Sequence, residues 1–440
     1  MNIVEQVKKS GVVGAGGAGF PTHIKLAAQA EWFLANGAEC EPLLHKDREV
    51  MIHFAQEIIE GLRLAVESVK AVKTSIGVKA KNQSAIKALR QAMSKTSFTL
   101  TEFGDYYPAG DEYEVVTGIT GRLIPPQGLP LDVGCVVNNV ETLYNVYLAS
   151  QNIPTTEKFL TIAGIVKHPV TVKVPIGMSF REVLDLAGGP TRSDFAIMES
   201  GLMMGKPADD LGKPVTKLTG GLIALPADHD VIQRYHRTNK QMRRIGHSAC
   251  DQCTYCTELC PRYLLGYDIQ PHLVMRSLGF TVTGPEIWNE YALLCCRCGL
   301  CTLYACPEAL YPREACIDGI NDLRAIGKGK WQGNKEIQVH AMKDGRRVPI
   351  KLLMQRLGVD QYESHAEYKD VQVRPNRVSI ALQQHVGVPA VPVVQRGESV
   401  KKGQLIADIP DDKLGAPLHA SIDGTVGEIS DTAIEIKATA

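Results

Sequence analysis

Two short runs of cysteine restrict this chain more than any other feature of its sequence. The first run has three cysteines at two-residue spacing, a fourth after three more residues, and then a proline: Cys250, Cys253, Cys256, Cys260 and Pro261. The second run repeats the triplet and places its fourth cysteine after four residues, again before a proline: Cys295, Cys298, Cys301, Cys306 and Pro307. Of the twelve cysteines, only Cys40 and Cys135 lie outside the region from Cys250 to Cys316. Such density in an intracellular chain favours metal binding over disulfide bonds.

The spacing is that of bacterial ferredoxins, in which three close cysteines hold one cluster and the fourth serves the other cluster. Two runs therefore predict two [4Fe–4S] clusters with crossed ligands. The first would be held by Cys250, Cys253, Cys256 and Cys306, and the second by Cys295, Cys298, Cys301 and Cys260. Cys296 and Cys316 fall outside the spacing, and we expect neither to be a ligand. A pair of zinc sites is the alternative, although zinc explains a triplet followed by Cys-Pro poorly.

A glycine-rich stretch, "GVVGAGGAGFPTHIK", lies near the N-terminus. Gly14, Gly16 and Gly19 match the dinucleotide fingerprint, and Glu39 and Glu41 follow about twenty residues later. The fingerprint should follow a buried strand, but only two valines precede it. Glycines let backbone amides approach an anion, and the N-terminus of the following helix favours negative charge. Lys25 lies one turn into that helix, from where its side chain could reach a phosphate. The alternative is a glycine-rich turn without a ligand.

The rest of the first half alternates between helical and strand-like segments. We expect helices over 50–70 and 82–93, strands over 74–80 and 98–103, and a long Gly/Pro-rich functional loop over 108–134. This alternation predicts an α/β sheet covered on both faces. From 157 onward the pattern reads strand, turn, strand and helix; the residues 267–280 are expected to form a helical linker, and the last seventy residues a small β sandwich.

Charge and hydropathy exclude several classes of function. The 48 basic residues balance the 48 acidic ones, so no net field favours nucleic acid or an anionic membrane. No apolar run approaches the ~18 residues that a membrane span needs. The N-terminal "MNIVEQVKKSG" lacks an apolar signal core, so we interpret it as mature cytosolic sequence.

Three segments carry a resemblance to known flavoproteins: "GAGGAGFPTHIK", "NGAECEPLLHKDRE" and "NNVETL". They resemble the FMN-binding segments of the flavin subunit of respiratory complex I, and still more those of the C subunit of the Rnf electron-transport complex. The complex I pattern has an acidic residue at the position of Ala38 and glycine at that of Cys40, and "GAECEP" is instead similar to the Rnf branch.

By matching position, the resemblance implies which residues would contact the cofactor. The glycine loop with Gly14, and above all Gly16, Gly17, Gly19 and Lys25, would hold the FMN phosphate. Asn36, Glu39 and Glu41 would lie along the ribityl and nicotinamide side, and Asn138, Asn139 and Glu141 would close the site. Asn138 and Asn139 could instead cap the following helix, and the glutamates could be ordinary loop carboxylates.

The order of the modules narrows the resemblance further. The strands after 155 look like the β-grasp (SLBB) module that follows the flavin domain in these families, and "GESVKKGQLI" and "APLHASIDGTV" are similar to the biotinyl/lipoyl-type hammerhead. The whole order resembles the cobalamin reductases of propanediol-utilisation microcompartments. We therefore predict an α/β multidomain chain: a Rossmann-like FMN/NADH-binding domain (1–152), an SLBB β-grasp module (153–235), a helical ferredoxin-like domain with two [4Fe–4S] clusters (236–325), a linker (326–370) and a barrel-sandwich hybrid module (371–440).

The resemblance implies an oxidoreductase in which NADH donates electrons through FMN and two [4Fe–4S] clusters to the cobalt of a corrinoid. The implied partners are an adenosyltransferase and a microcompartment shell in the cytoplasm. We find no catalytic acid–base triad. One alternative is an Rnf-like subunit that feeds ferredoxin or a membrane complex, and a more distant one is a non-enzymatic zinc-binding structural protein.

Overall fold

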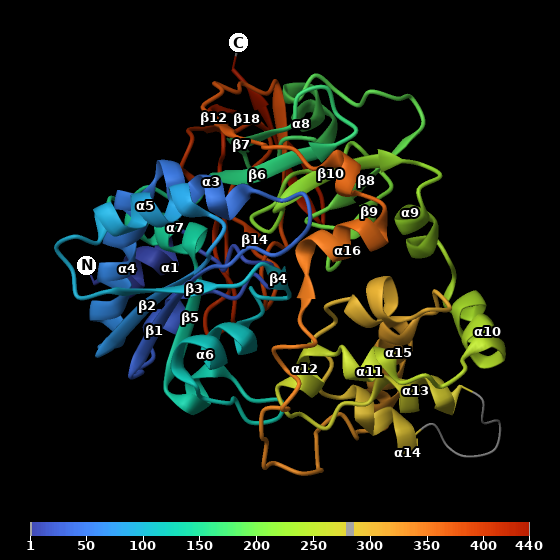
Figure 1. Ribbon diagram of the computed structural model, residues 1–440. Helices are drawn as coiled ribbons and strands as arrows, with labels where there is room; N and C mark the ends of the chain where they lie inside the picture. The colour runs from blue at the N-terminus through green and yellow to red at the C-terminus, as the bar shows by residue number, and fades with distance from the viewer. Residues whose placement is uncertain (1, 279–285, 440) are drawn as a thin grey trace.

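The computed structural model describes residues 2–278 and 286–439 and packs them into four parts (Figure 1). The N-terminal domain lies on one side, and the cysteine-rich domain lies below and opposite it. The β-grasp module and the C-terminal β module lie above them. The last two residues of the helical linker expected over 267–280 lie outside the described residues. Within that segment the structure has the helix α13 (Pro271–Ser277).

The N-terminal domain is built on a four-stranded parallel sheet of order β3-β2-β1-β5. Its strands are β1 (Trp32–Gly37), β2 (Lys73–Lys79), β3 (Thr99–Phe103) and β5 (Cys135–Asn139). Successive residues Phe33 and Leu34 point to opposite faces, and both are fully buried in two different hydrophobic clusters. A sheet buried on both faces is typical of parallel α/β architecture. The predicted Rossmann-like domain is therefore confirmed.

Helices cover both faces of this sheet. The larger cluster lies under α1 (Ile3–Lys9), α4 (Ala55–Val69), α5 (Gln83–Ala92) and α7 (Val140–Ser150), and the smaller one lies under α6 (Glu112–Thr120). The short helix α2 (Thr22–Leu26) follows the glycine loop. The backbone of α4 approaches α7 closely, because a Cβ at Gly61 would lie 1.9 Å from the Leu143 carbonyl oxygen.

Two expectations for this domain were wrong. The helix expected over 50–70 is broken at Phe54 into α3 (Lys46–His53) and α4, because the Phe54 ring leaves the helical path and packs against Tyr144 and Phe159. The stretch 108–134, expected to be a loop, contains α6, whose first turn is capped by the Asp111 carboxylate. That carboxylate accepts hydrogen bonds from the Tyr113 and Glu114 amides.

The β-grasp module is a six-stranded mixed sheet of order β12-β7-β6-β10-β8-β9. The strands from the module itself are β6 (Glu157–Gly164), β7 (Val170–Pro175), β8 (Phe195–Glu199), β9 (Lys206–Ala208) and β10 (Gly221–Pro226). The strands β6 and β7 form an antiparallel hairpin, and β10 lies parallel to β6. The helix α8 (Phe180–Leu186) begins with a Ser179–Glu182 capping box and packs on this sheet.

The cysteine-rich domain consists of short helices joined by loops. They are α10 (Asn239–Ala249), α11 (Tyr255–Glu258), α12 (Pro261–Leu264), α13, α14 (Glu286–Asn289), η2 (Glu290–Ala292), η3 (Cys301–Ala305) and α15 (Pro312–Ala325). The helix α9 (Asp230–Tyr235) leads into it from the β-grasp module. Its own apolar cluster is small, and several of the cysteines belong to it.

The segment 326–370, expected to be a linker, adds elements to other parts of the molecule. Its strand β11 (Val348–Pro349) pairs with β4 (Tyr106–Tyr107) of the N-terminal domain, and β12 (Tyr368–Lys369) forms the edge of the β-grasp sheet. Between them, α16 (Ile350–Leu357) buries its apolar face in a cluster that includes Cys298. The segment therefore ties three parts of the molecule together.

The C-terminal module contains two antiparallel sheets around one apolar core. One sheet has the order β13-β19-β18-β15, and the other has the order β14-β16-β17. Their strands are β13 (Arg377–Ala381), β14 (Val391–Pro392), β15 (Ser399–Val400), β16 (Leu405–Asp408), β17 (Leu418–His419), β18 (Gly424–Ile429) and β19 (Ala433–Ala438). Among residues 2–278 and 286–439, no helix has both the length and the apolar character that crossing a membrane requires.

Candidate functional site

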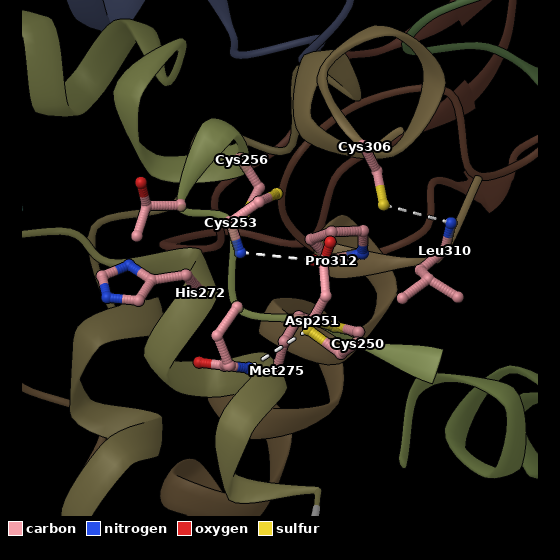
Figure 2. A pocket seen from close by; sticks show the side chains of 11 residues that line it. Cys250, Asp251, Cys253, Cys256, His272, Met275, Cys306, Leu310 and Pro312 are labelled. Atoms are coloured by element: carbon pink, nitrogen blue, oxygen red, sulfur yellow. Dashed lines mark hydrogen bonds between the residues drawn. The ribbon is translucent and has the colours of Figure 1, made fainter. Parts of the chain in front are cut away.

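Four cysteines from the two sequence runs line one cavity in the cysteine-rich domain (Figure 2). Three come from the first run and its helix α11, and the fourth comes from the end of η3: Cys250, Cys253, Cys256 and Cys306. Burial, and then the neighbouring thiols, raise the pKa of Cys256 to about 12. The described residues contain no set of three His, Cys, Asp or Glu side chains close enough to hold a single metal ion. The thiols surround a space, as a cluster of several metal atoms requires.

The other four cysteines of the motif form a second group. Cys260 comes from the first run and lies near Cys295, while Cys301 lies near both of them. Burial is the main cause that raises the pKa of the Cys301 thiol, and Cys295, Cys256 and Cys260 add to it. Cys298 is also buried, and its pKa is raised first by the neighbouring Cys296, then by burial and by Cys260 and Cys301. The structure therefore brings the predicted second set of thiols together with Cys260 crossed over from the first run.

The two cysteines outside the motif lie against the second group. Cys316 is fully buried and shares a thiol hydrogen bond with Cys295. Cys296 shares one with Cys298 and also lines a cavity beside Cys295. Sequence spacing could not have placed them here, because the loop that carries Cys296 turns back and α15 brings in Cys316 from a distance.

Backbone geometry holds these thiols in place. The loops pass through left-handed conformations at Gln252 and Thr254 in the first run and at Arg297 and Gly299 in the second. Such turns aim successive N–H groups inward. The Arg297 amide lies 3.3 Å from the Cys295 sulfur; likewise, the Leu310 amide lies 3.3 Å from the Cys306 sulfur. N–H donors to sulfur are a feature of iron–sulfur sites, where they tune the reduction potential. The thiol donors and their surroundings fit such clusters.

The N-terminal domain contacts the second cysteine group directly. The Tyr107 hydroxyl donates to the Cys298 carbonyl oxygen at 2.6 Å. Arg262, two residues after Cys260, forms a bidentate pair with Asp111 and lies 3.7 Å over the ring of Tyr113. These contacts were not predicted, although the position of Arg262 beside the Cys-Pro motif was a usable signal.

The glycine loop is exposed at its tip. Gly16 and Gly17 are solvent-exposed, and Gly17 adopts a φ of +123° with open space where a Cβ would point. Gly14 donates its N–H to the Phe20 carbonyl and closes the base of the loop. Gly19 has a φ of +68° and lies against Leu218 of the β-grasp module. The loop thus presents free backbone to a ligand at Gly16 and Gly17 while its ends are fixed.

The loop packs over the start of α7. The Ala15 amide donates to the Thr142 hydroxyl at 2.9 Å, and a Cβ on Gly16 would lie 3.3 Å from the Asn139 Cβ. Lys25, on α2, donates to the Val137 carbonyl at 2.8 Å and pairs with Glu112 at 3.3 Å. The structure thus brings Gly16 close to Asn139, and it places the Lys25 ammonium group beside the middle of β5.

The asparagines of the three segments have different environments. Asn139 caps α7 by accepting the Glu141 N–H at 3.0 Å, and its amide donates to Asp47 at 2.7 Å. Asn36 donates to the Gly110 carbonyl at 2.9 Å. Asn138 is buried, and its side-chain nitrogen has no hydrogen-bond partner among the described residues. An orphaned buried donor beside a glycine loop fits a ligand rich in acceptors, such as FMN.

The two glutamates of the second segment are half-buried and engaged within the protein. Glu39 accepts the Asp47 N–H at 3.1 Å, and burial followed by the charge of Asp47 raises its pKa. Glu41 accepts N–H groups of Met203 and Met204 at 3.0 and 2.9 Å, and burial raises its pKa to about 7. Glu39 therefore joins the Asp47–Asn139 network, whereas Glu41 fastens the N-terminal domain to the β-grasp module.

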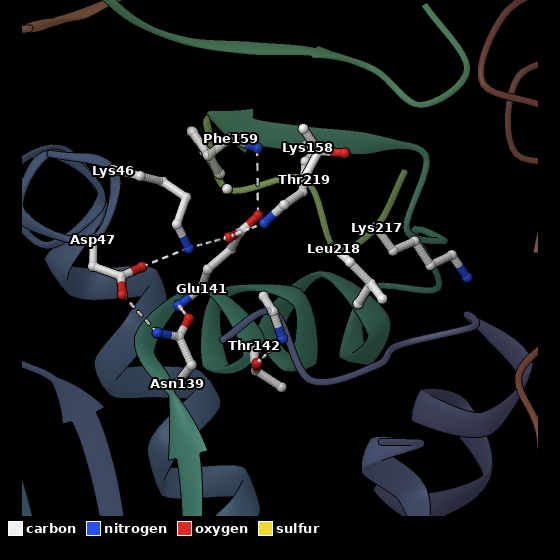
Figure 3. Close-up of polar contacts among 12 residues, drawn as sticks. Lys46, Asp47, Asn139, Glu141, Thr142, Lys158, Phe159, Lys217, Leu218 and Thr219 are labelled. Atoms are coloured by element: carbon white, nitrogen blue, oxygen red, sulfur yellow. Dashed lines mark hydrogen bonds and ion pairs between the residues drawn. The ribbon is translucent and has the colours of Figure 1, made fainter. Parts of the chain in front are cut away.

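Glu141 lies in a buried ion cluster (Figure 3). Its carboxylate is 2.7 Å from the Lys46 ammonium and also pairs with Lys158. Burial alone would raise its pKa, but the two ammonium groups hold it below the usual range. All three side chains are almost fully enclosed, so this carboxylate is engaged within the protein. Lys46 and Asp47 were missed, although both belong to the segment "NGAECEPLLHKDRE" that carried the resemblance.

Four protein-family models match the chain in succession. They are the Nuo51 FMN-binding domain over residues 7–148, the SLBB domain over 159–206, the 4Fe–4S dicluster domain over 249–311 and the RnfC barrel sandwich hybrid domain over 358–440. The predicted fold class is confirmed by these matches.

Two similar proteins span nearly the whole chain. Cobalamin reductase PduS of Citrobacter freundii is 41% identical over 437 residues, which is 99% of this chain and 96% of the relative. The protein of the same name from Salmonella typhimurium is 41% identical over 435 residues, with the same shares.

A more distant relative matches part of the chain. The C subunit of the proton-translocating ferredoxin:NAD(+) oxidoreductase complex of Clostridium ljungdahlii is 32% identical over 294 residues, which make up 66% of this chain and 60% of that relative. Among solved structures, NAD+-reducing [NiFe]-hydrogenase in the H2-reduced state superposes with a TM-score of 0.50 at 21% identity, over 83% of this chain and 68% of that chain. The latter likeness concerns the fold alone.

Proposed function

The chain belongs to the cobalamin reductase family that includes PduS, an oxidoreductase family with FMN-binding and iron–sulfur domains, and from this premise we propose that it uses NADH to reduce the cobalt of a corrinoid. The observation that carries the proposal is the 41% identity maintained over 99% of the chain. The geometry supports it, because flavin-binding and thiol-rich parts are packed against each other through Tyr107 and Arg262.

The proposed electron balance is simple. NADH gives two electrons and becomes NAD+ and a proton, and two cob(III)alamin molecules each take one electron and become cob(II)alamin. FMN, when bound, supplies the conversion between a two-electron donor and one-electron acceptors. Cys250, Cys253, Cys256 and Cys306 would hold one [4Fe–4S] cluster, and Cys295, Cys298, Cys301 and Cys260 would hold the other; when bound, the clusters would supply one-electron transfer.

The chain's own residues would hold the flavin as follows. The exposed backbone of Gly16 and Gly17 receives the phosphate, with Lys25 nearby on α2. The unpartnered Asn138 amide donates to the cofactor, and Asn36 and Asn139 frame the other side. Glu39 and Glu41 keep the second segment in place through the contacts described above.

The reduced corrinoid would pass to an adenosyltransferase, and the reaction would take place in the cytoplasm inside a bacterial microcompartment. This setting follows the name of the relatives' family. A partner that consumes reduced cobalt directly would prevent its reoxidation by solvent oxygen.

The experiment is an anaerobic ultraviolet–visible titration of the purified holoprotein. We expect flavin and iron–sulfur absorbance that NADH bleaches, followed by cob(II)alamin absorbance when cob(III)alamin is added. NADPH serves as the matched donor control. Bleaching without reduction of the corrinoid would contradict the proposal and favour ferredoxin as acceptor, the candidate suggested by the relative from Clostridium ljungdahlii. Protein without any chromophore would contradict both.

A further inference from the structure

An unassigned cleft lies between the β-grasp module and the cysteine-rich domain. Its cavity volume is about 450 Å³, and it opens to solvent. Its walls come from the Met204–Gly205 turn, from α9 and α10, from the second cysteine loop and from α15. No step assigned above uses it.

The cleft lies next to the loops that carry both cysteine groups. Arg297 lines it and lies between Cys295 and Cys298, and Thr302 lines it directly after Cys301. Arg234 forms its floor and donates to the Thr302 carbonyl at 2.8 Å and to the Leu310 carbonyl at 2.9 Å. Because Leu310 in turn donates to the Cys306 sulfur, a molecule in the cleft would be within a residue or two of ligands from both groups. A short path of this kind suits an electron exit.

The charge in the cleft is unbalanced. Four guanidinium groups line it against two carboxylates. Arg313 is paired with Glu314, and Asp318 with Arg243 from outside the cleft. Arg237 and Arg297 are exposed, and neither side chain has a hydrogen-bond or ion-pair partner within residues 2–278 and 286–439. Free guanidinium groups recognise phosphate oxygens with paired hydrogen bonds.

We propose that this cleft binds the corrinoid acceptor, with the phosphodiester of its nucleotide tail held by Arg237 and Arg297; this rests on the proposed function. The size agrees with a small-molecule site that is open on one side, since ligand pockets measure roughly 300–1,000 Å³ and this cleft has a cavity volume of about 450 Å³. Tyr235 and Tyr311 also line the cleft, with Arg313 stacked over the Tyr235 ring and Arg234 over the Tyr311 ring. When bound, the cluster would supply one electron to each cob(III)alamin held in the cleft, and the product would be cob(II)alamin.

The test compares charge reversals inside and outside the cleft in the anaerobic holoprotein. The variants are Arg237→Glu and the double variant Arg237→Glu/Arg297→Glu. The control is Arg244→Glu, an exposed arginine on α10 that does not line the cleft. We expect the KM for cob(III)alamin to rise about tenfold or more in the double variant, less in the single one, and to stay unchanged in the control. Iron content and the rate of NADH-driven bleaching establish that the clusters are intact.

Equilibrium dialysis with cob(III)alamin separates the possible failures. Binding that weakens in step with the KM supports the cleft. Unchanged KM and binding in both variants overturn it while leaving the proposed function in place. Loss of ferredoxin reduction with an unchanged KM for the corrinoid also overturns it and assigns the cleft to an acidic protein. Wild-type protein that binds cob(III)alamin in the cleft without reducing it would refute the function but not the site.

Discussion

Cys306 is the residue whose position most sharply tests the crossed arrangement of the thiols. It belongs to the second run but lines the cavity of the first group, with its sulfur held by the Leu310 amide. We predict that Cys306→Ala lowers the iron content from about eight to about four atoms per chain. Iron analysis with low-temperature electron paramagnetic resonance measures this. Cys296→Ala, which changes a neighbouring thiol outside the motif, should retain all the iron; iron loss in that variant instead would refute the assignment.

Gly17 is the residue whose substitution tests the flavin site. Its φ of +123° belongs almost only to glycine, and the space at its Cβ position is where we expect phosphate. We predict that Gly17→Ala weakens FMN binding about tenfold, since the strain costs about 1–3 kcal/mol and the methyl group enters the site. Fluorescence titration of flavin-free protein measures the Kd. Gly397→Ala is the matched control, because Gly397 also has a positive φ and open space but lies in the C-terminal module. An equal loss of FMN affinity in both variants would show that backbone strain alone causes the loss, and would contradict the assignment of Gly17 to the phosphate site.

Among the elements, α3, α7 and β6 are joined by the buried Glu141 between Lys46 and Lys158. Removing its charge leaves the buried Lys158 ammonium without its counter-charge, while Lys46 keeps its ion pair with Asp47 at 2.6 Å, and breaking a buried pair in this way costs about 3–5 kcal/mol. We therefore predict that Glu141→Gln lowers the free energy of unfolding by that amount in anaerobic urea titrations. Glu112→Gln, which removes the partly exposed pair with Lys25, should cost less than about 1 kcal/mol. If the Glu141→Gln protein is as stable as the wild type but has lost its flavin, the prediction is wrong and Glu141 contributes to cofactor binding instead.

The elements also show what the sequence could and could not predict. Alternation predicted β2 and β3 and the helices before and between them, because a buried parallel strand and an amphipathic helix each leave a local pattern. The break at Phe54 was not predictable, since its cause is packing against Tyr144 and Phe159, which are remote in sequence. The helix α6 was missed because glycines and prolines flank it, although Asp111 and Glu114 at its start were a usable capping signal.

The candidate site also has features that the sequence predicted and features that it did not. The spacing of the cysteines predicted both groups, because short spacers force thiols to converge. The positions of Arg262 and Lys46 in the motifs were usable signals, but their partners were not predictable, since each partner comes from a different module or a distant segment. Glu41 was expected along the ribityl and nicotinamide side, which stays a prediction; its contact with the β-grasp turn at Met203 was not predictable, because that turn is remote in sequence.

At the scale of the whole molecule, Lys217 is the point where three modules meet. It belongs to the β-grasp module and donates to the carbonyl oxygens of Gly11 in the N-terminal domain, at 2.6 Å, and Pro417 in the C-terminal module, at 3.0 Å. No carboxylate among the described residues pairs with it, and it is almost fully buried. Val386 of the C-terminal module also donates to the Gly19 carbonyl, so the same junction supports the glycine loop.

This junction makes the stability of the molecule depend on pH in a definite direction. Burial lowers the pKa of Lys217 from 10.5 to about 7. The unfolded chain therefore binds one more proton between these values, and the stability that Lys217 contributes rises with pH across this window and is lost as pH falls toward 7. Burial also lowers the pKa of the neighbouring His385 and His419 from 6.5, so neither titrates in the window.

We predict that Lys217→Met removes this dependence. The slope of unfolding free energy against pH should fall by about 1 kcal/mol per pH unit between pH 7.5 and 9.5, near the limit for one group. At pH 9 the variant should also be less stable by about 1–3 kcal/mol, because two buried carbonyls lose their donor. Anaerobic urea unfolding at several pH values measures both effects. Lys413→Met, an exposed lysine of the C-terminal module, should keep the wild-type slope. A slope that persists in Lys217→Met would mean that Lys217 is protonated in the folded molecule, with its charge solvated at the junction.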